Sequence, residues 1–239
     1  MDKLVQQLVE KLQKAFGDRL VSAVLYGSAA AGDRQEKFSD YNVLCVLSRV
    51  TTRELSDSEA IFRWWRENGS PAPLLLSEQE LTASTYCFPI EFNDMKRQNR
   101  LLAGKDVIST LVVDERFYRA QVQHDLRAKL LRLRQKASGI LSDSSLLRRL
   151  LLDSVSTFCV LFRHALILHG AEGPAAKRDV LAAASQRFGF DPLPFDKLLA
   201  IREQQLNARE VAPVALLGSY LEAISVVIAA VDRLEIAPP

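Results

Sequence analysis

Two short polar motifs, each beside an apolar segment, contain the residues best suited to chemistry. Gly27-Ser28 follows the apolar segment 20–26, and Asp40 and Asn42 stand at the start of the segment 41–50. Gly27 has no Cβ, so its backbone can approach a phosphate closely, and Ser28 adds a hydroxyl before an alanine-rich turn whose free N–H groups attract anions. Asp40 and Asn42 share one face of the expected strand, because side chains alternate with period two. This spacing suits two ligands of one metal ion.

A third acid is expected on a later strand. Apolar and polar residues alternate over 88–93, which predicts a strand with Glu91 on the face opposite its apolar neighbours. Glu91 would then complete the cluster with Asp40 and Asn42 from a neighbouring strand. Asp94, three positions further on, competes for this role, and a solvent-facing strand residue is the alternative interpretation of Glu91.

This arrangement resembles the nucleotidyltransferase superfamily, in which a strand leads to Gly-Ser, a loop of roughly ten residues and then Asp-x-Asp or Asp-x-Glu, with a third carboxylate on a later strand. The resemblance covers about residues 20–113, and the helical region after it is similar to the helical domain of aminoglycoside nucleotidyltransferases. It implies an α+β fold: a small mixed sheet with flanking helices, followed by an all-α helical bundle.

The resemblance also implies roles for individual residues. Carboxylates of this superfamily hold Mg²⁺ against a nucleoside triphosphate, and the third acid can assist deprotonation of the attacking hydroxyl. Carried over by position, Gly27 and Ser28 would hold phosphate, Asp40 would bind metal, and Glu91 would be the third acid and a metal ligand. The implied partner is a nucleoside triphosphate, with an acceptor that the sequence does not specify.

The chain departs from this pattern at the second acid, which is Asn42. An Asn oxygen can coordinate Mg²⁺ but brings no charge. A site made of Asp40, Asn42 and Glu91 would carry two negative charges rather than three, so a pair of metal ions would be harder to hold. One Mg²⁺ ion is therefore expected rather than two.

A second departure is the segment 29–31, which is Ala-Ala-Ala where superfamily members often place an Arg. Lys96, Arg97 and Arg100 follow the Glu91 segment and could supply the missing cation, with Lys96 as the candidate for binding nucleotide. A solvated basic surface is the alternative for all three.

Composition and periodicity predict two domains, 1–113 and 114–239. The 239 residues carry 48% hydrophobic and 25% charged side chains, as in globular chains that bury a core. In the first domain we expect helices at 2–16 and 52–68 and strands at 20–26, 41–50, 73–77 and 88–93. The segment 107–113 is either a further strand or a tight docking segment. In the second domain, Asp114 caps a helix that reaches about 138, and further helices follow near 143–169, 177–188, 194–206 and 211–234.

Several functional classes are disfavoured. A net charge of +2 argues against a protein held on nucleic acid mainly by phosphate contacts. Three scattered cysteines suggest neither a disulfide framework nor a zinc site, and they fit a reducing compartment. An amphipathic N-terminus is not a signal peptide, and we find no run of about 18 apolar residues, so we expect a cytoplasmic protein without a membrane span.

Two features of the second domain have other interpretations. Arg163 and His169 resemble the Arg and His pattern of HEPN ribonucleases, although a helix-terminal His with a surface Arg is the simpler interpretation. The basic residues within 127–136 could attract an anion or form a solvated helix face. The last helix, 211–234, is apolar enough for the core or for a homodimer contact.

Three functions therefore remain. The first is a protein that binds Mg-nucleoside triphosphate between the two domains and transfers a nucleotidyl group to a hydroxyl of a small molecule or protein. The second is a catalytically inactive nucleotidyltransferase fold with a binding or regulatory role, which Asn42 and the missing Arg favour. The third is a HEPN-like ribonuclease of the helical domain.

Overall fold

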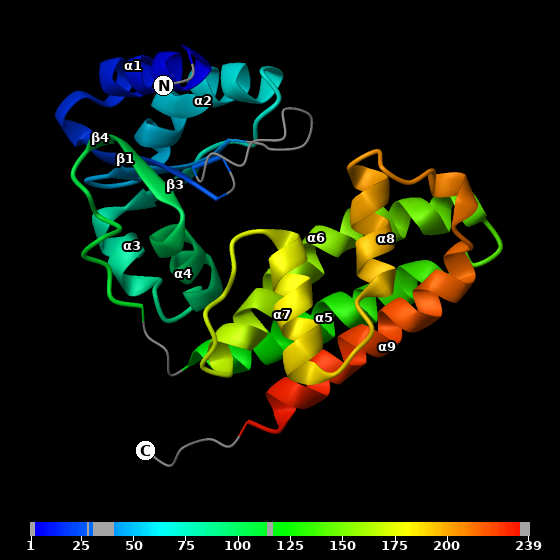
Figure 1. Ribbon diagram of the computed structural model, residues 1–239. Coiled ribbons are helices and arrows are strands. Elements are labelled where there is room, and N and C mark those ends of the chain that lie inside the picture. Colours follow the sequence, from blue (N-terminus) through cyan, green and yellow to red (C-terminus); the bar gives the residue numbers. More distant parts are fainter. Residues whose placement is uncertain (1–2, 28, 31–40, 114–116, 235–239) are drawn as a thin grey trace. The chain divides into compact units, whose positions relative to one another are not determined.

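The computed structural model describes residues 3–27, 29–30, 41–113 and 117–234. The chain divides into two compact units, Met1–Tyr118 and Arg119–Pro239, here called the N-terminal unit and the helical unit. The sequence interpretation placed this division between residues 113 and 114. The N-terminal unit contains a four-stranded sheet with helices, whereas the described part of the helical unit contains helices alone (Figure 1).

The sheet has the strand order β3-β2-β1-β4. Its strands are β1 (Leu20–Tyr26), β2 (Asn42–Leu47), β3 (Leu74–Ser77) and β4 (Asn99–Gly104). β1 pairs antiparallel with both β2 and β4, and β2 pairs parallel with β3. This mixed sheet, together with the helices around it, confirms the α+β fold class.

Helices cover both faces of the sheet (Figure 1): α1 (Lys3–Phe16) and α2 (Thr52–Glu67) one face, α3 (Glu78–Ala83) and α4 (Pro89–Arg97) the other. Alternation along the strands separates two cores. The first contains Val5, Leu8, Leu12, Phe16, Ala23, Leu25, Tyr41, Val43, Cys45, Leu47 and Trp65. The second contains Val21, Val24, Leu44, Val46, Leu81, Phe92, Met95, Ile108 and Leu111. Along β2, even-numbered residues therefore face the α3 and α4 layer.

The prediction of a strand at 88–93 is wrong, because this segment forms α4. Pro89 occupies a first-turn position of the helix, where its fixed φ is favourable and its missing N–H costs nothing. Glu91 lies in the first turn and Lys96 in the last, which complements the helix dipole. An alternation of six residues does not distinguish a strand from a short helix, whereas Pro89 was the available signal.

The segment 107–113 follows the second of its two predicted alternatives. It forms turns and loop rather than a strand, and its apolar residues Ile108 and Leu111 dock tightly into the second core. The sequence analysis missed β4, whose residues are mostly exposed and whose two leucines are adjacent, so it shows no apolar alternation. It also missed α3, which begins at a capping box formed by Ser77 and Glu80.

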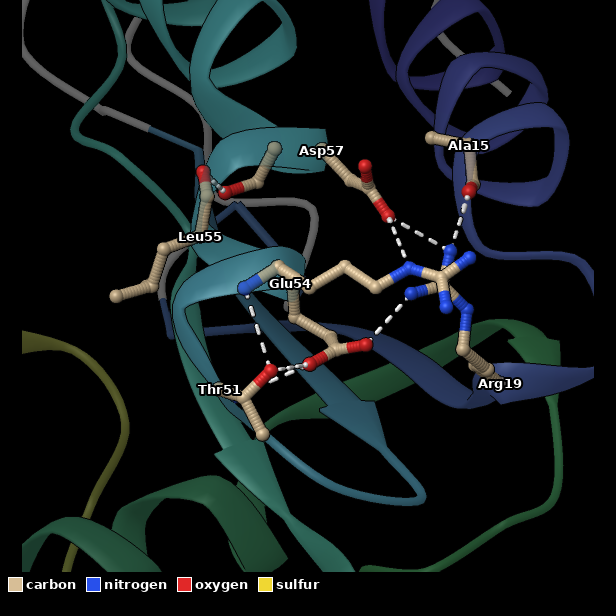
Figure 2. Close-up of polar contacts among 8 residues, drawn as sticks. Ala15, Arg19, Thr51, Glu54, Leu55 and Asp57 are labelled. Atoms are coloured by element: carbon tan, nitrogen blue, oxygen red, sulfur yellow. Dashed lines mark hydrogen bonds and ion pairs between the residues drawn. The ribbon is translucent and has the colours of Figure 1, made fainter.

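An ionic network ties the end of α1 to α2, through the short helix η1 (Gly17–Arg19) (Figure 2). Arg19 binds Oε1 of Glu54 at 2.6 Å and Oδ2 of Asp57 at 2.7 Å, and it also donates to the carbonyl of Ala15 at 3.0 Å. The other oxygen of Glu54 accepts from the backbone N–H and the hydroxyl of Thr51, which completes the capping box of α2.

The helical unit contains α5 (Tyr118–Ser138), α6 (Ser144–Leu168), α7 (Lys177–Phe188), α8 (Leu193–Arg202), the short helix η3 (Ala208–Glu210) and α9 (Pro213–Asp232). The predicted helices are thus present, with bounds that differ by a few residues, and Asp114 lies outside the described residues. The helix α6 packs against α7, α8 and α9. An aromatic cluster fills the space between them: Phe158, Phe162, Phe190, Phe195 and Tyr220.

Two helices of this unit, α6 and α9, are long and apolar enough to cross a membrane by length and composition alone. The expectation of no membrane span rested on the absence of an unbroken apolar run, whereas a helix meets the present test with up to two charged residues, so that expectation stays a prediction. The most apolar windows of α6 and α9 are 50% and 44% buried inside the structure. The core helix of a helical bundle has the same properties, so length and composition do not by themselves indicate a membrane span.

Candidate functional site

The predicted site residues fall into two groups. Ser28 and Asp40 lie outside the described residues, so their predicted roles stay predictions. Gly27, Asn42 and Glu91 lie within the described part of the chain, at or near the end of β1. Their arrangement defines the candidate site.

The last residue of β1, Tyr26, pairs with Asn42 at the start of β2 and with Asn99 at the start of β4. Directly opposite residues of adjacent strands point to the same face of a sheet. This face is the one covered by α3 and α4, because Tyr26 packs against the second core and Asn42 alternates with Leu44. Three polar side chains from three strands therefore lie next to one another.

Gly27 begins the turn after β1 with φ of +79°, a conformation that favours glycine. A methyl group built on Gly27 would lie 3.6 Å from Nδ2 of Asn42, so the turn passes close to this amide. The N–H of Gly27 donates to the carbonyl of Gln98 at 3.0 Å, and the N–H of Ala30 donates to the carbonyl of Gly27 at 2.9 Å. These two N–H groups are therefore engaged within the fold rather than free for an anion.

Ala29 and Ala30 pack against the first core. The turn after Gly27 thus uses small apolar side chains to lie on the core at the position where superfamily members often carry an Arg. A long cationic side chain would have to leave this packed position to reach a phosphate.

Glu91 is exposed and projects from the first turn of α4, not from a strand. Its charge nevertheless reaches the strand ends, because it helps to raise the pKa of Tyr26. The larger cause of that raised pKa is burial of the Tyr26 hydroxyl, which disfavours the charged phenolate. The structure therefore brings Glu91 near Tyr26 and Asn42, although by a different element from the one predicted.

Tyr26 is a candidate site residue that sequence reasoning missed. A raised pKa keeps its hydroxyl protonated at neutral pH, so it can donate a hydrogen bond to an anionic ligand. The available signal was an aromatic hydroxyl on the last residue of an apolar strand, directly before the glycine turn.

Carboxylates are sparse at this end of the sheet. Neither β3 nor β4, the two strands that follow β2, contains an Asp or Glu. Among the described residues, no three His, Cys, Asp or Glu side chains form a group that could hold a metal ion. A metal site here would therefore depend on Asp40 together with Asn42 and Glu91.

The cation predicted to bind nucleotide, Lys96, extends along the N-terminal unit to the carbonyl of Leu111, where its Nζ donates a hydrogen bond of 2.6 Å. Asn99 donates to the carbonyl of Met95 at 2.9 Å. One of the three donors of the Lys96 ammonium is thus engaged within the fold, and its predicted contact with nucleotide stays a prediction.

The helical unit contains a second candidate, a cluster of cations around the buried thiol of Cys159. Burial raises the pKa of this thiol to about 12, and the charges of Lys177, Arg202 and Arg163 oppose that rise. Lys177 is the first residue of α7, and its pKa is lowered by desolvation and by the like charge of Arg202. Arg202 donates to the hydroxyl of Ser156 at 2.6 Å. These cations give this part of the helical unit a positive potential.

Neighbouring carboxylates of the same unit are bound by a different cation. Arg178 donates to Glu203 at 2.5 Å and lies 3.6 Å from Asp196. Arg178 therefore offsets the negative charges of Glu203 and Asp196. Lys177 and Arg202 add positive charge to the same region. Sequence reasoning missed this cluster because its members come from three different helices and only the packing of α6, α7 and α8 gathers them.

The histidine of the ribonuclease hypothesis has a packed position. His169 caps the end of α6, its ring contacts Phe188 edge-on at 5.0 Å, and its Nε2 is buried with no hydrogen-bond partner among the described residues. Burial and the charge of Arg187 lower its pKa. His164, one turn earlier, is fully buried. The contact with Phe188 makes His169 a packing residue between α6 and α7, and burial is typical of a structural role for His164.

The comparisons with known proteins agree with this architecture. No protein-family model matches the chain, and no curated protein is similar to it in sequence. Comparison with solved structures shows that the chain has a nucleotidyltransferase-type fold, as the sequence resemblance implied. One such structure is spectinomycin adenyltransferase AAD(9) from Enterococcus faecialis, crystallised with ATP and spectinomycin. The two superpose with a TM-score of 0.60 at 15% identity over 97% of this chain and 99% of that one.

Proposed function

We propose that this protein binds a magnesium-bound nucleoside triphosphate and acts as a nucleotide-binding member of this fold rather than as an efficient nucleotidyltransferase. The observation that carries the proposal is the cluster of Tyr26, Asn42 and Glu91 on one face of the sheet beside the Gly27 turn. The fold supports it, because the similar structure of AAD(9) was crystallised with ATP.

We infer binding without efficient transfer because the candidate metal site has too few carboxylates to hold two Mg²⁺ ions. Nucleotidyltransferases generally use Mg²⁺ with ATP, and displacement at phosphorus is best supported by two clamped ions. Here Asn42 contributes an oxygen without charge, and Glu91 projects from a helix rather than from a strand adjacent to β2. We infer that Asp40 and Asn42 hold one Mg²⁺ ion through oxygen ligands, which is the donor type that Mg²⁺ prefers.

Two side chains of the N-terminal unit are the proposed donors for phosphate. The protonated hydroxyl of Tyr26 can donate to a phosphate oxygen. Ser28 remains a predicted donor.

Isothermal titration calorimetry with a non-hydrolysable ATP analogue tests the proposal. We expect binding that needs Mg²⁺, and we expect Asp40→Ala and Tyr26→Phe each to weaken it by about tenfold. Glu59→Ala, which removes an exposed carboxylate of α2, is the matched control for Asp40→Ala and should leave the affinity unchanged. Equal affinity for the analogue in Asp40→Ala and in the unmodified protein, or no binding at all, would overturn the proposal.

Nucleotidyl transfer is the second candidate, and the specific observation for it is that the likeness to an adenyltransferase extends across both units rather than the sheet alone. Incubation with α-labelled ATP and a panel of hydroxyl acceptors that includes spectinomycin decides between the two. Our proposal expects labelled product from Asn42→Asp at higher rates than from the unmodified chain. A fast transfer by the unmodified chain that Asn42→Asp does not raise would favour the second candidate.

A further inference from the structure

A groove between α5 and α9 is a feature of the helical unit that nucleotide binding does not use. The cavity measures about 250 Å³, and Leu130, Leu131, Ile228 and Ala229 form its apolar lining. Arg127 and Arg134 lie along the α5 side. A groove of this kind between two helices can accept side chains from a further helix.

The walls of the groove are fixed by hydrogen bonds to Asp232 at the end of α9. Arg127 donates to Oδ1 of Asp232 at 2.9 Å, and Gln123 donates to the same oxygen at 2.8 Å. Arg119 donates to the backbone carbonyl of Asp232 at 3.0 Å. These bonds hold α5 against α9, so the groove exists before any partner binds. Binding therefore costs little conformational entropy in this part of the protein.

The groove is bordered by an exposed apolar side chain, that of Leu131. Leu131 is 62% exposed, although its neighbour Leu130 is buried. On the α9 side the lining residues Ser225 and Ala229 are small, which lets another backbone approach closely. Leu131 therefore extends the apolar lining of the groove to the exposed surface of α5, where a partner could cover it.

The charge around the groove is uneven. The helix α5 carries six Lys and Arg residues against one Asp. Among the described residues that line the groove, the single carboxylate is Asp232, which Arg127 binds. Arg134 is therefore the lining cation left to face an incoming partner, with Lys129 and Arg132 raising the potential around the same helix.

We propose that this groove docks an acidic amphipathic helix of a partner protein. The apolar side of such a helix would cover Leu131 and fill the space above Ala229, and its Glu or Asp residues would face α5 and pair with Arg134. Charge complementarity selects this occupant, because a second copy would present the same cations and repel. The concave floor suits inserted side chains rather than a flat lipid surface.

Fluorescence anisotropy with a labelled model peptide of about 18 residues tests the proposal, a length that gives five turns of helix. The peptide carries Leu at helical spacing i, i+3, i+4 and i+7 and Glu on the flanking positions, and a second peptide has Lys in place of every Glu. We expect micromolar binding of the Glu peptide and at least tenfold weaker binding of the Lys peptide. We expect Leu131→Glu to weaken binding of the Glu peptide at least tenfold.

Two substitutions on α5 distinguish a direct contact between the peptide and the groove from a general attraction of the peptide to the positive charge of α5. Arg134→Glu and Arg132→Glu change the net charge equally and on the same helix, but only Arg134 lines the groove. We expect Arg134→Glu to weaken binding of the Glu peptide about tenfold and Arg132→Glu less than threefold. Equal effects of the two, or peptide binding that ignores Leu131→Glu, would overturn the proposal.

Two further outcomes identify another occupant and likewise contradict the proposal. Sedimentation of vesicles that contain phosphatidylserine, lost in Leu131→Glu, together with no binding of the Glu peptide, would assign the surface to an anionic membrane. A dimer by light scattering that Leu131→Glu converts to a monomer would assign it to a second copy of the chain. Because none of these readouts uses nucleotide, failure here leaves the proposed function untouched.

Discussion

The N-terminal unit contains two polar clusters, one beside each helical layer of its sheet, and they are built in opposite ways. Beside α2, the buried carboxylate of Glu54 meets the guanidinium of Arg19 and the hydroxyl of Thr51. Beside α4, the exposed carboxylate of Glu91 lies near the phenol of Tyr26, and its charge disfavours ionisation of that phenol.

The two clusters teach how to separate a stabilising polar group from a binding one. Hydrogen bonds from Thr51 and Arg19 lower the pKa of Glu54 to about 2, because both stabilise its charged form. In the second cluster, polar groups gather at strand ends around a glycine turn, and the raised pKa of Tyr26 leaves a protonated hydroxyl that can donate to a ligand. We therefore expect substitutions in the first cluster to affect folding and those in the second to affect ligand binding.

The largest expected effect is on folding, through Glu54→Ala. Loss of the Glu54 carboxylate would leave Arg19 with one fewer hydrogen-bond partner and would remove the capping box of α2. We expect the melting temperature of the N-terminal unit, followed by circular dichroism, to fall by more than about 5 °C. The control Glu59→Ala, in an exposed pair with Arg63, should change it by less than about 2 °C. Similar small changes in both variants would show that the network is not stabilising.

The same carboxylate predicts a dependence of stability on pH. The pKa of Glu54 is lower in the folded state than the ordinary 4.5, so its contribution is fully present above about pH 4.5 and is lost as the pH falls toward about 2. Urea unfolding between pH 6 and pH 3 should show that the stability from Glu54 is constant down to about pH 4.5 and decreases below it, with a shallower decrease in Glu54→Gln. An unchanged slope in Glu54→Gln would assign the acid sensitivity to other groups.

The sequence predicted much of the fold because the relevant signals are local. Helices such as α1 show apolar residues at helical spacing, and β1 and β2 are compact apolar runs between polar turns. The errors lie where local signals conflict. The segment 88–93 alternates like a strand, but Pro89 and the charges at its ends favour a helix, and burial of Phe92 and Met95 decides the outcome.

The candidate site was predictable in part for the same reason. Gly27 and Asn42 follow from motif spacing, and the structure places them side by side. Tyr26 and Lys177 were missed because their roles depend on what tertiary packing brings near them, Glu91 for the first and Arg202 for the second. Neither the hydrophobic periodicity nor a local motif of a single sequence indicates which distant residues become neighbours in the fold.

A smaller effect, on binding rather than folding, is expected from Asn42→Asp. The added charge faces the same side of the sheet as Tyr26, so Mg²⁺ affinity in the presence of the ATP analogue should rise about three- to tenfold. The melting temperature without metal should change little, because Asn42 lies at the start of β2 and is only half-buried. Titration calorimetry checks the affinity, and no change would show that position 42 does not face the metal.

The smallest expected effect is on the titration of Tyr26 itself, and it tests whether Glu91 acts on this site. Replacing Glu91 by Gln removes a negative charge near the phenol, so the pKa of Tyr26 should fall while staying above its ordinary 10, since burial is the larger cause of the raised value. Ultraviolet difference titration of Glu91→Gln, with Tyr26→Phe to identify the signal, measures this shift. The matched control Glu59→Gln, on exposed α2, should leave it unchanged. A Tyr26 pKa that is the same in Glu91→Gln and in the unmodified chain would place the helix charge too far from the strand ends to take part in binding, and Asp40 and Asn42 would remain as the sole predicted metal ligands.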